Sequence, residues 1–345
     1  MPDIEAKLKF LQAPETYGES GPFLECIETH MSWVFLVDKW AFKLKKPVCF
    51  PFLDFTTLKA REFYCREEVR LNARMAPAIY LGVVALQWHD GAFALVPEAQ
   101  LPAPGETVDW LVLMRRLPLH RMLLQLIASH NVAPKDIDAL VDLLGTFYRA
   151  APVAGVSAND YLARFQHEQV SNRELLLRPQ FQLRDAALAI DRLGVALSQG
   201  ADLLRTRASG GRVLDGHGDL RPDHVFLLQP PVVIDCLEFN PQLRQVDPFD
   251  EIAYLSLECE MAGAPWIGPH LMAGVAAALG DPPQPTLMHL YTAHRALLRA
   301  RLAMAHLLDP QPRSPEKWPP LAERYMTRAL AATDAFTSTM RHGTP

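Results

Sequence analysis

The sequence of 345 residues lacks several patterns that identify whole classes of protein. It has no run of about 20 apolar residues, which is the length that a membrane-spanning helix needs. Its first residues, MPDIEAKLKFLQAPE, mix acidic residues with lysines and contain no apolar core, so they do not read as a secretory signal. We therefore expect a cytoplasmic protein without a membrane partner.

Paired cysteines and excess positive charge are also missing. The five cysteines are scattered and never form a C-x-x-C pair, which gives little support to a disulfide framework or a zinc site. The net charge is −5, whereas nucleic-acid binding normally shows as a basic excess, so we expect no nucleic-acid partner. With 49% hydrophobic residues, the chain has enough apolar surface for a sizeable core and for two lobes.

The densest group of ionisable residues lies between Val213 and Asn240, in VLDGHGDLRPDHVFLLQPPVVIDCLEFN. Two β-rich runs, 225–228 and 232–234, are separated by a proline turn, which predicts a hairpin. Asp219 precedes the first strand and Asp235 ends the second, so we expect the two carboxylates to converge.

Three further side chains accompany these carboxylates, namely His217, Arg221 and His224. Metal-assisted phosphoryl transfer needs hard oxygen ligands for the metal and a proton acceptor for the attacking hydroxyl. The segment therefore predicts a site for this chemistry. A metal-hydrolase site built from His217, Asp219, His224 and Asp235 is an alternative, although such sites generally use more histidines at close spacing.

Residues 217–224, HGDLRPDH, resemble the catalytic loop of the aminoglycoside phosphotransferase and protein kinase superfamily, whose protein-kinase form reads H-R-D-L-K-P-E-N. The resemblance implies that Asp219 is the base that accepts the proton of the substrate hydroxyl. It implies that Arg221 contacts the transferred phosphate and that Asp235, in IDCLEF, binds the metal as the D-F-G aspartate does. His224 replaces the metal-binding asparagine of the family, and imidazole is a poorer ligand for magnesium than an amide oxygen.

Two β-rich runs, Trp33 to Val37 and Trp40 to Leu44, predict an antiparallel hairpin. Alternation along the second strand puts Ala41, Lys43 and Lys45 on one face. WAFK is similar to the V-A-I-K strand of kinases, which implies that Ala41 borders the adenine and Lys43 reaches the phosphates, with Lys45 as its rival. The alternative is a solvated strand edge that its lysines protect from pairing.

The glycine-rich phosphate loop of kinases is missing before Trp33, where the sequence reads ETHMS. Any phosphate contact at this point is expected from backbone amides or from the hydroxyls of Thr29 and Ser32.

Residues 56–76 predict a helix that ends before Pro77. Glu68 falls on its apolar stripe, where a carboxylate must be paired, and the kinase pattern supplies Lys43 as the partner. CREEVRLNARMAPAIYLGVVAL resembles a bacterial group of aminoglycoside-phosphotransferase-like proteins, some of which carry an extra P-loop domain. The sequence has no G-x-x-x-x-G-K-[ST], so we expect no such domain.

The remaining chain predicts three more strands and then a helical body. The family topology implies that the backbone of Leu113 to Arg115, including Met114, reads the adenine edge. Asp247 is expected to cap a helix that starts at Pro248, and Asp250 is a candidate brace for the catalytic loop. The expected helices comprise residues 136–150, 161–177, 185–206 and 287–308.

Together these patterns predict an α+β, bilobal protein-kinase-like fold, with a small antiparallel-sheet lobe over residues 1–115 and a larger helical lobe over residues 116–345. The leading functional hypothesis is transfer of the γ-phosphate of ATP, with Mg²⁺, to a hydroxyl of a small molecule. A nucleotide-binding pseudokinase is the alternative that His224 and the missing glycine loop suggest. A kinase that acts on a protein hydroxyl is a third.

Overall fold

The computed structural model describes residues 2–18, 24–50 and 53–342, and the chain divides into two compact units. The first unit comprises residues 1–126 and 223–243, and the second comprises residues 127–222 and 244–345. Within the described ranges, no helix combines the length and the apolar character needed to cross a bilayer.

The first unit is built on a six-stranded antiparallel sheet with the strand order β1-β2-β3-β8-β6-β7. The β2–β3 hairpin has the expected two-residue turn, where Asp38 adopts a positive φ of 49°. The strands of the sheet are β1 (Leu24–Glu28), β2 (Ser32–Val37), β3 (Trp40–Lys45), β6 (Tyr80–His89), β7 (Ala92–Pro97) and β8 (Glu106–Arg115).

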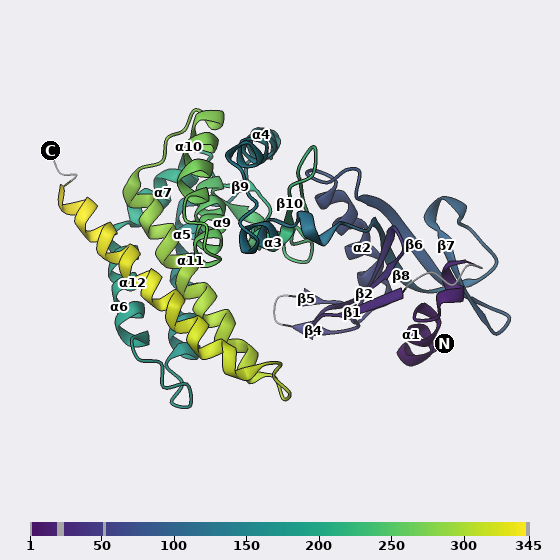
Figure 1. Ribbon diagram of the computed structural model, residues 1–345. Coiled ribbons are helices and arrows are strands. Elements are labelled where there is room, and N and C mark those ends of the chain that lie inside the picture. The colour runs from purple at the N-terminus through teal and green to yellow at the C-terminus, as the bar shows by residue number, and fades with distance from the viewer. Residues whose placement is uncertain (1, 19–23, 51–52, 343–345) are drawn as a thin grey trace. The chain divides into compact units, whose positions relative to one another are not determined.

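Each face of this sheet packs against a different helix, as Figure 1 shows for α1 (Ile4–Leu11) and α2 (Leu58–Asn72). Leu44 and Leu111 belong to the apolar cluster beneath α1, whereas Ala41 and Val112 belong to the cluster beneath α2. The alternation of a β-strand thus produces the two faces expected for residues 40–45. The remaining short elements of the unit are β4 (Cys49–Phe50), β5 (Leu53–Asp54), α3 (Leu123–Ala128), which ends just beyond the unit, and the 3₁₀ turns Pro14–Tyr17, Glu98–Gln100 and Leu119–Arg121.

Helix α2 is shorter than the sequence indicated. It begins after the capping residue Thr57, whose hydroxyl accepts a hydrogen bond from the Ala60 N–H, and it ends at Asn72. The Asn72 carbonyl then accepts hydrogen bonds from the N–H groups of Met75 and Ala76, which close a turn in place of another helical turn. The expected end at residue 76 was therefore wrong by one turn.

The predicted hairpin after the catalytic-loop sequence is present as β10 (Val225–Phe226) and β11 (Val232–Val233), which pair antiparallel. Phe226 and Val232 pack into the apolar cluster beneath α2, and Phe226 also bridges to Met122. These contacts place residues 223–243 with the first unit, whereas the sequence had assigned them to the helical lobe. Because of this apolar packing, the first unit contains two separate stretches of the chain and does not simply end at residue 115.

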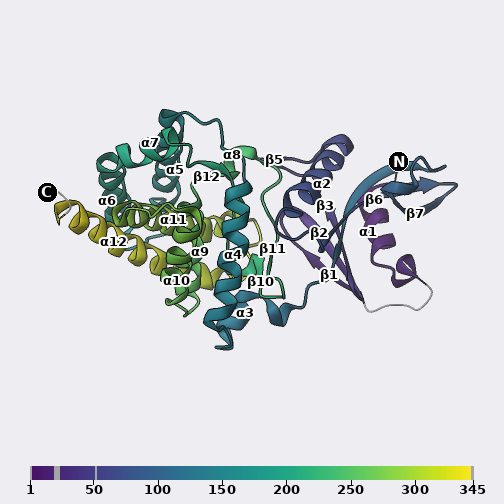
Figure 2. The ribbon, with the colours of Figure 1, turned by 90° about the horizontal axis from the view of Figure 1, so that it is seen from above.

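The second unit is mainly helical (Figure 2). Helices α11 and α12 lie side by side in both ribbon views. As expected, Asp247 caps α9, and its carboxylate accepts the N–H of Phe249. The helices are α4 (Pro134–Ala150), α5 (Ala158–Leu176), α6 (Ala186–Gln199), α7 (Ala201–Ser209), α9 (Pro248–Met261), α10 (Ile267–Leu279), α11 (Pro285–Ala305) and α12 (Trp318–His342). The short elements are β9 (Leu214–Asp215), which pairs with β12 (Gln245–Val246), and the 3₁₀ turns His306–Leu308 and Pro315–Lys317. The 3₁₀ turn Pro222–His224 and α8 (Pro241–Arg244) each include residues of both units.

Residues 185–206 form two helices, not the single helix that the sequence predicted. The chain breaks at Gly200, where a Cβ atom would lie 2.8 Å from Leu290 Cδ2 on α11. The absence of a side chain at this point allows α11 to approach closely, and glycine also weakens helix continuation.

Candidate active site

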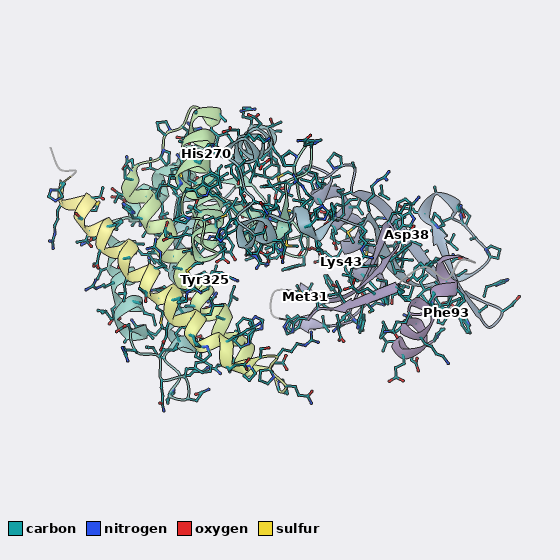
Figure 3. The ribbon with its side chains drawn as sticks, in the orientation of Figure 1. Met31, Asp38, Lys43, Phe93, His270 and Tyr325 are labelled. Atoms are coloured by element: carbon teal, nitrogen blue, oxygen red, sulfur yellow. The ribbon has the colours of Figure 1, made fainter. Side chains whose placement is uncertain are left out.

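Lys43, which is labelled in Figure 3, forms ion pairs with two carboxylates of the first unit. Its Nζ donates to Glu68 Oε1 at 2.8 Å and to Asp235 Oδ1 at 3.0 Å. The expected pair of Lys43 and Glu68 is therefore present, and the same ammonium also holds the aspartate of the IDCLEF segment. The three side chains come from β3, from α2 and from the residues that follow β11.

Lys45 pairs with the other oxygen of Glu68. Its Nζ lies 2.6 Å from Glu68 Oε2, and it also donates to Glu238 and sits 4.9 Å from the centre of the Phe55 ring. The side chain of Lys45 is 1% exposed, whereas that of Lys43 is 17% exposed. Of the two lysines that the sequence left open, Lys43 is the one that a ligand can reach.

The charges of this cluster stabilise one another against burial. Burial disfavours the ammonium of Lys43, but the carboxylates of Asp235 and Glu68 outweigh it and hold the pKa of Lys43 well above its usual value. Burial alone would raise the pKa of Glu68, yet Lys43 and Lys45 together lower it. For Glu238, burial dominates and raises the pKa despite Lys45. Lys43 and Glu68 are therefore ionised at neutral pH.

Asp235 has a strained backbone and a half-exposed carboxylate. Its φ is 63°, which is uncommon for a residue other than glycine. Hydrogen bonds from the Asp235 N–H to the Tyr80 hydroxyl, at 3.3 Å, and from the Cys236 N–H to Asn72 Oδ1, at 2.9 Å, fix this conformation. Oδ2 lies 3.6 Å from Nε2 of His224. A positive φ at a residue other than glycine persists only where neighbouring contacts hold it, and these two hydrogen bonds hold the backbone from which the Asp235 carboxylate projects.

The residues around Asp235 fit a cation only in part. Among the residues that the structure describes, no three His, Cys, Asp or Glu side chains are grouped to hold a metal. Magnesium, however, is commonly held by one or two carboxylates together with phosphate oxygens and water. The carboxylate of Asp235 is 48% exposed and suits this role, whereas His224 offers a nitrogen that magnesium binds poorly.

Asp219 and Arg221 belong to the second unit, and they contact each other. Arg221 Nε lies 3.0 Å from Asp219 Oδ1, and the hydroxyl of Tyr254 donates to the same oxygen at 3.2 Å. Both side chains are partly exposed, at 26% for Asp219 and 20% for Arg221. Asp219 is thus a partly exposed carboxylate with Arg221 as an ion-pair partner and the Tyr254 hydroxyl as a hydrogen-bond donor, and its convergence with Asp235 stays a prediction.

Glu251 braces the loop that carries Asp219. This buried carboxylate accepts the backbone N–H groups of His217, at 2.9 Å, and Gly218, and the hydroxyl of Tyr148 donates to it at 2.9 Å. Gly216 has no room for a side chain, because a Cβ atom would lie 2.8 Å from Glu251 Oε2. The loop is therefore anchored on α9 through its backbone.

The sequence had suggested Asp250 for this brace, and that suggestion was wrong by one residue. Asp250 instead forms two hydrogen bonds with Arg295 of α11, at 2.7 and 2.6 Å. Adjacent residues of a helix point in different directions, and no pattern in the sequence indicates which of the two acids faces the loop. Glu238 was also missed, because the resemblance to the kinase motif assigns no role to any residue after Asp235.

Four further candidate residues lie in or beside the sheet of the first unit. Ala41 is the register partner of Met114, and both belong to the apolar cluster beneath α2. The N–H of Arg115 donates to the Ile79 carbonyl at 2.9 Å, and the Arg115 guanidinium lies 5.8 Å from the Trp40 ring. The Ser32 hydroxyl is buried and shares a hydrogen bond of 2.9 Å with that of Thr29. In this conformation, an adenine edge cannot use the N–H of Arg115.

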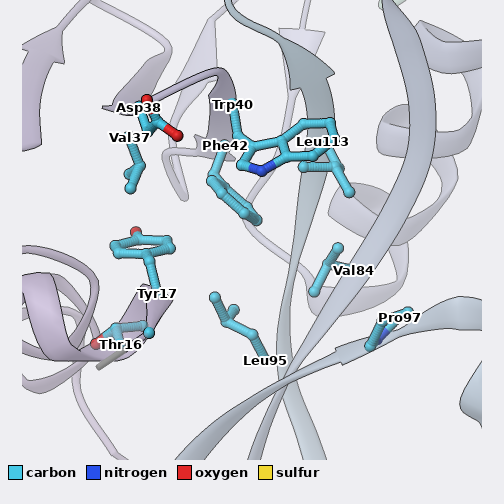
Figure 4. A pocket seen from close by; sticks show the side chains of 11 residues that line it. Thr16, Tyr17, Val37, Asp38, Trp40, Phe42, Val84, Leu95, Pro97 and Leu113 are labelled. Carbon is cyan, nitrogen blue, oxygen red and sulfur yellow. The ribbon is translucent and has the colours of Figure 1, made fainter. Parts of the chain in front are cut away.

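A pocket of about 540 Å³ lies on the sheet face that is opposite to α2 (Figure 4). Its walls include Tyr17, Trp40, Phe42 and Leu113. Its lining includes neither Ala41 nor any residue of the ion-pair cluster, so the two are separate. We therefore assign it no role in the chemistry.

No protein-family model matches the chain. Uncharacterized proteins of Mycobacterium tuberculosis and Mycobacterium bovis are 30% identical to it over 298 residues, which cover 84% of this chain and 57% of those proteins. The chain thus spans little more than half the length of these relatives.

Solved structures share the fold at low sequence identity. A choline kinase of Cryptosporidium parvum aligns with a TM-score of 0.58 and 10% identity over 99% of this chain and 97% of its own. A choline/ethanolamine kinase family protein of Mesorhizobium loti aligns with a TM-score of 0.54 and 14% identity over 96% of each chain. An aminoglycoside phosphotransferase, APH(4)-Ia, in a ternary complex with AMP-PNP and hygromycin B, aligns with 0.53 and 12% over 95% and 97%. The expected fold class is confirmed.

Proposed function

Because the chain has the two-lobed, protein-kinase-like fold of choline kinases and aminoglycoside phosphotransferases, we propose that it is an ATP-dependent phosphotransferase that acts on a small-molecule hydroxyl. The solved structures of this fold include a choline kinase and a phosphotransferase in complex with AMP-PNP and hygromycin B, which supports a nucleotide and a small-molecule acceptor. The fold alone does not fix a substrate. The residues of this chain must therefore carry the proposal.

The observation that carries it is the Lys43 ammonium, which is shared between Glu68 and Asp235. In kinases, the strand lysine positions the phosphates, the helix glutamate holds the lysine and the aspartate after the hairpin binds the metal. The same residue types occur here on β3, on α2 and after β11, in the same chain order. An ion pair between α2 and β3 alone would be a common structural feature, whereas this set of three is much more specific.

In the proposed reaction, ATP would give its γ-phosphoryl group to the acceptor oxygen and leave as ADP, and Mg²⁺, when bound, would neutralise charge on the phosphates. Lys43 would bind the phosphates, and Asp235 would hold the metal through its exposed carboxylate. Asp219 would orient the acceptor hydroxyl and take its proton, and Arg221, which forms an ion pair with Asp219, would contact the transferred phosphate. The protein would contribute mainly placement and charge neutralisation.

The proposal is tested by incubating the purified protein with γ-labelled ATP, Mg²⁺ and a metabolite extract, followed by mass spectrometry of phosphorylated products. A positioned general base typically contributes about 10²- to 10⁴-fold, so we expect Asp219→Asn to lower the turnover by at least about 100-fold. Asp223→Asn, a change in the same chain segment outside the proposed chemistry, is the matched control. Equal turnover in Asp219→Asn and the unsubstituted protein would remove Asp219 as the base.

A nucleotide-binding pseudokinase is the second candidate, and His224 is the observation that favours it. Nε2 of His224 lies 3.6 Å from the carboxylate of Asp235. The asparagine of the kinase family would offer an amide oxygen at this position, and magnesium binds an amide oxygen better than an imidazole nitrogen. Tight ATP binding without turnover on any acceptor would support this reading. Detection of phosphate on the protein itself would instead indicate a protein hydroxyl as the acceptor.

A further inference from the structure

Lys45 and Glu238 form a second ion pair behind Lys43, and the reaction described above does not use it. Lys45 connects Oε2 of Glu68 to the carboxylate of Glu238, just as Lys43 connects Oε1 of Glu68 to Asp235. Each lysine thus joins α2 to one acid of residues 235–238. Glu68 has both oxygens occupied, and it is 0% exposed.

The two lysines differ in the freedom that their surroundings allow. Lys45 is enclosed by Glu68, Glu238 and the Phe55 ring, and Glu238 is itself buried. Lys43 has an exposed edge, and its second acid, Asp235, is half exposed. A ligand can therefore compete for Lys43 and Asp235, whereas the contacts of Lys45 are closed to it.

The charges of the four inner groups also balance. Lys43 and Lys45 face Glu68 and Glu238, and the carboxylate of Asp235 is the additional negative charge. If Lys45 were absent, Lys43 would be the remaining lysine partner of Glu68, and Glu238 would be a buried carboxylate without its cation. Lys43 would then be drawn towards both oxygens of Glu68. Buried carboxylates need such partners, so this rearrangement is the expected response.

We propose that Lys45, together with Glu238, is a positioning residue that occupies one oxygen of Glu68 and so directs Lys43 towards the nucleotide phosphates. This inference rests on the proposed function, since it assigns Lys43 to the phosphates. The side chain of Lys45 is 1% exposed, so a ligand cannot reach it. Its effect on nucleotide binding must therefore pass entirely through Lys43.

A double-mutant cycle tests this dependence, because two residues that act through one another have non-additive effects. The pair is removed as Lys45→Met with Glu238→Met, since replacing both members of a buried ion pair by apolar residues leaves no unpaired charge. The dissociation constant for MgATP is measured by calorimetric titration in the unsubstituted protein, in Lys43→Met, in the pair-removed variant and in their combination. Circular dichroism verifies that each variant is folded.

We expect pair removal to weaken MgATP binding by about tenfold when Lys43 is present and by less than about twofold when Lys43 is Met, which is within the range of coupled neighbours. Lys7→Met is the matched control. Lys7 is a buried lysine of the same unit that pairs with Asp109 at 2.8 Å and with no residue of the Lys43–Lys45 cluster, so its loss should leave the affinity unchanged.

An equal loss of affinity in both backgrounds, or no loss in either, overturns the positioning role. If the pair-removed variant does not fold, Lys45→Met with Glu238→Gln is carried through the same cycle, because it also frees Oε2 of Glu68 and the neutral amide leaves no unpaired charge at residue 238. Failure of the proposed function looks different: either the unsubstituted protein does not bind MgATP, or Lys43→Met binds it equally well. Weaker binding in Lys43→Met without any effect of pair removal contradicts the positioning role alone.

Discussion

His294 of α11 is an ionisable side chain that the fold buries without full hydrogen bonding. It is 6% exposed, it packs on Phe165 with ring centres 4.6 Å apart, and its Nδ1 has no hydrogen-bond partner among the described residues. Burial lowers the pKa of His294 to about 4, and the nearby Asp250 opposes this effect only in part. In the unfolded chain, a histidine titrates near pH 6.5.

This difference predicts a loss of stability in mild acid. Because the folded pKa is depressed, the unfolded state binds the proton more tightly, and stability is lost as the pH falls from about 6.5 through about 4. For this group alone, we expect the free energy of unfolding to fall by about 2 kcal/mol between pH 7 and pH 5. Urea unfolding of His294→Leu should lack this contribution, whereas the exposed His167→Gln should retain it. Parallel pH profiles for His294→Leu and the unsubstituted protein would contradict the account.

The candidate residues show which parts of a site a sequence can supply. The sequence singled out Lys43, Glu68, Asp219 and Asp235 because the kinase resemblance gives each of them a chemical role, and the structure pairs the first two as expected. Glu238 and Glu251 were not found, because each acts through the position that folding gives its carboxylate. Supporting contacts of this kind leave no regular spacing in the sequence.

The break between α6 and α7 is a second feature that depends on packing. Gly200 adopts a φ of −91°, which any residue can adopt, so a side chain here would not strain the backbone. Glycine is instead required because there is no room for a Cβ atom. A Cβ atom would lie 2.8 Å from Leu290 Cδ2 and 3.3 Å from Phe336 Cε2. The periodicity of residues 185–206 is helical on both sides, which explains why the sequence predicted one helix.

We therefore expect Gly200→Ala to lower the free energy of unfolding by about 1–3 kcal/mol through overpacking. Gly194→Ala, within α6, is the matched control, because the nearest atom to a Cβ there would be Gln169 Nε2 at 4.0 Å. Alanine in an open helix interior should stabilise by about 0.5–1 kcal/mol. Thermal unfolding of both variants tests the contrast, and equal shifts in the two would show that the close approach to α11 does not matter.

Hairpins and caps were predicted more reliably, because their signals are local. The β2–β3 turn at Asp38 and Lys39 and the cap at Asp247 each involve a few consecutive residues. The same locality explains the error at the end of α2, since a proline at residue 77 sets a limit for the helix but does not fix its last turn.

Taken as a whole, the chain keeps the fold of small-molecule kinases while sharing 10–14% of its residues with the solved examples. At that level, overall identity carries no functional information, and the order of a few motifs along the chain made the fold predictable. The composition of the two units was not predictable, because the packing of Phe226 and Val232 brings residues 223–243 into the first unit. The sequence of a hairpin does not indicate which distant part of the chain its apolar side chains will contact.

The most direct test of the whole account is calorimetric titration of MgATP into the unsubstituted protein, Lys43→Met and Lys39→Met. Lys39 is an exposed lysine of the same hairpin and serves as the control. We predict that Lys39→Met binds like the unsubstituted protein, whereas Lys43→Met binds at least about tenfold more weakly, which corresponds to about 1.4 kcal/mol or more. Equal affinity in all three proteins, or no binding of MgATP by the unsubstituted protein at millimolar concentration, would contradict it.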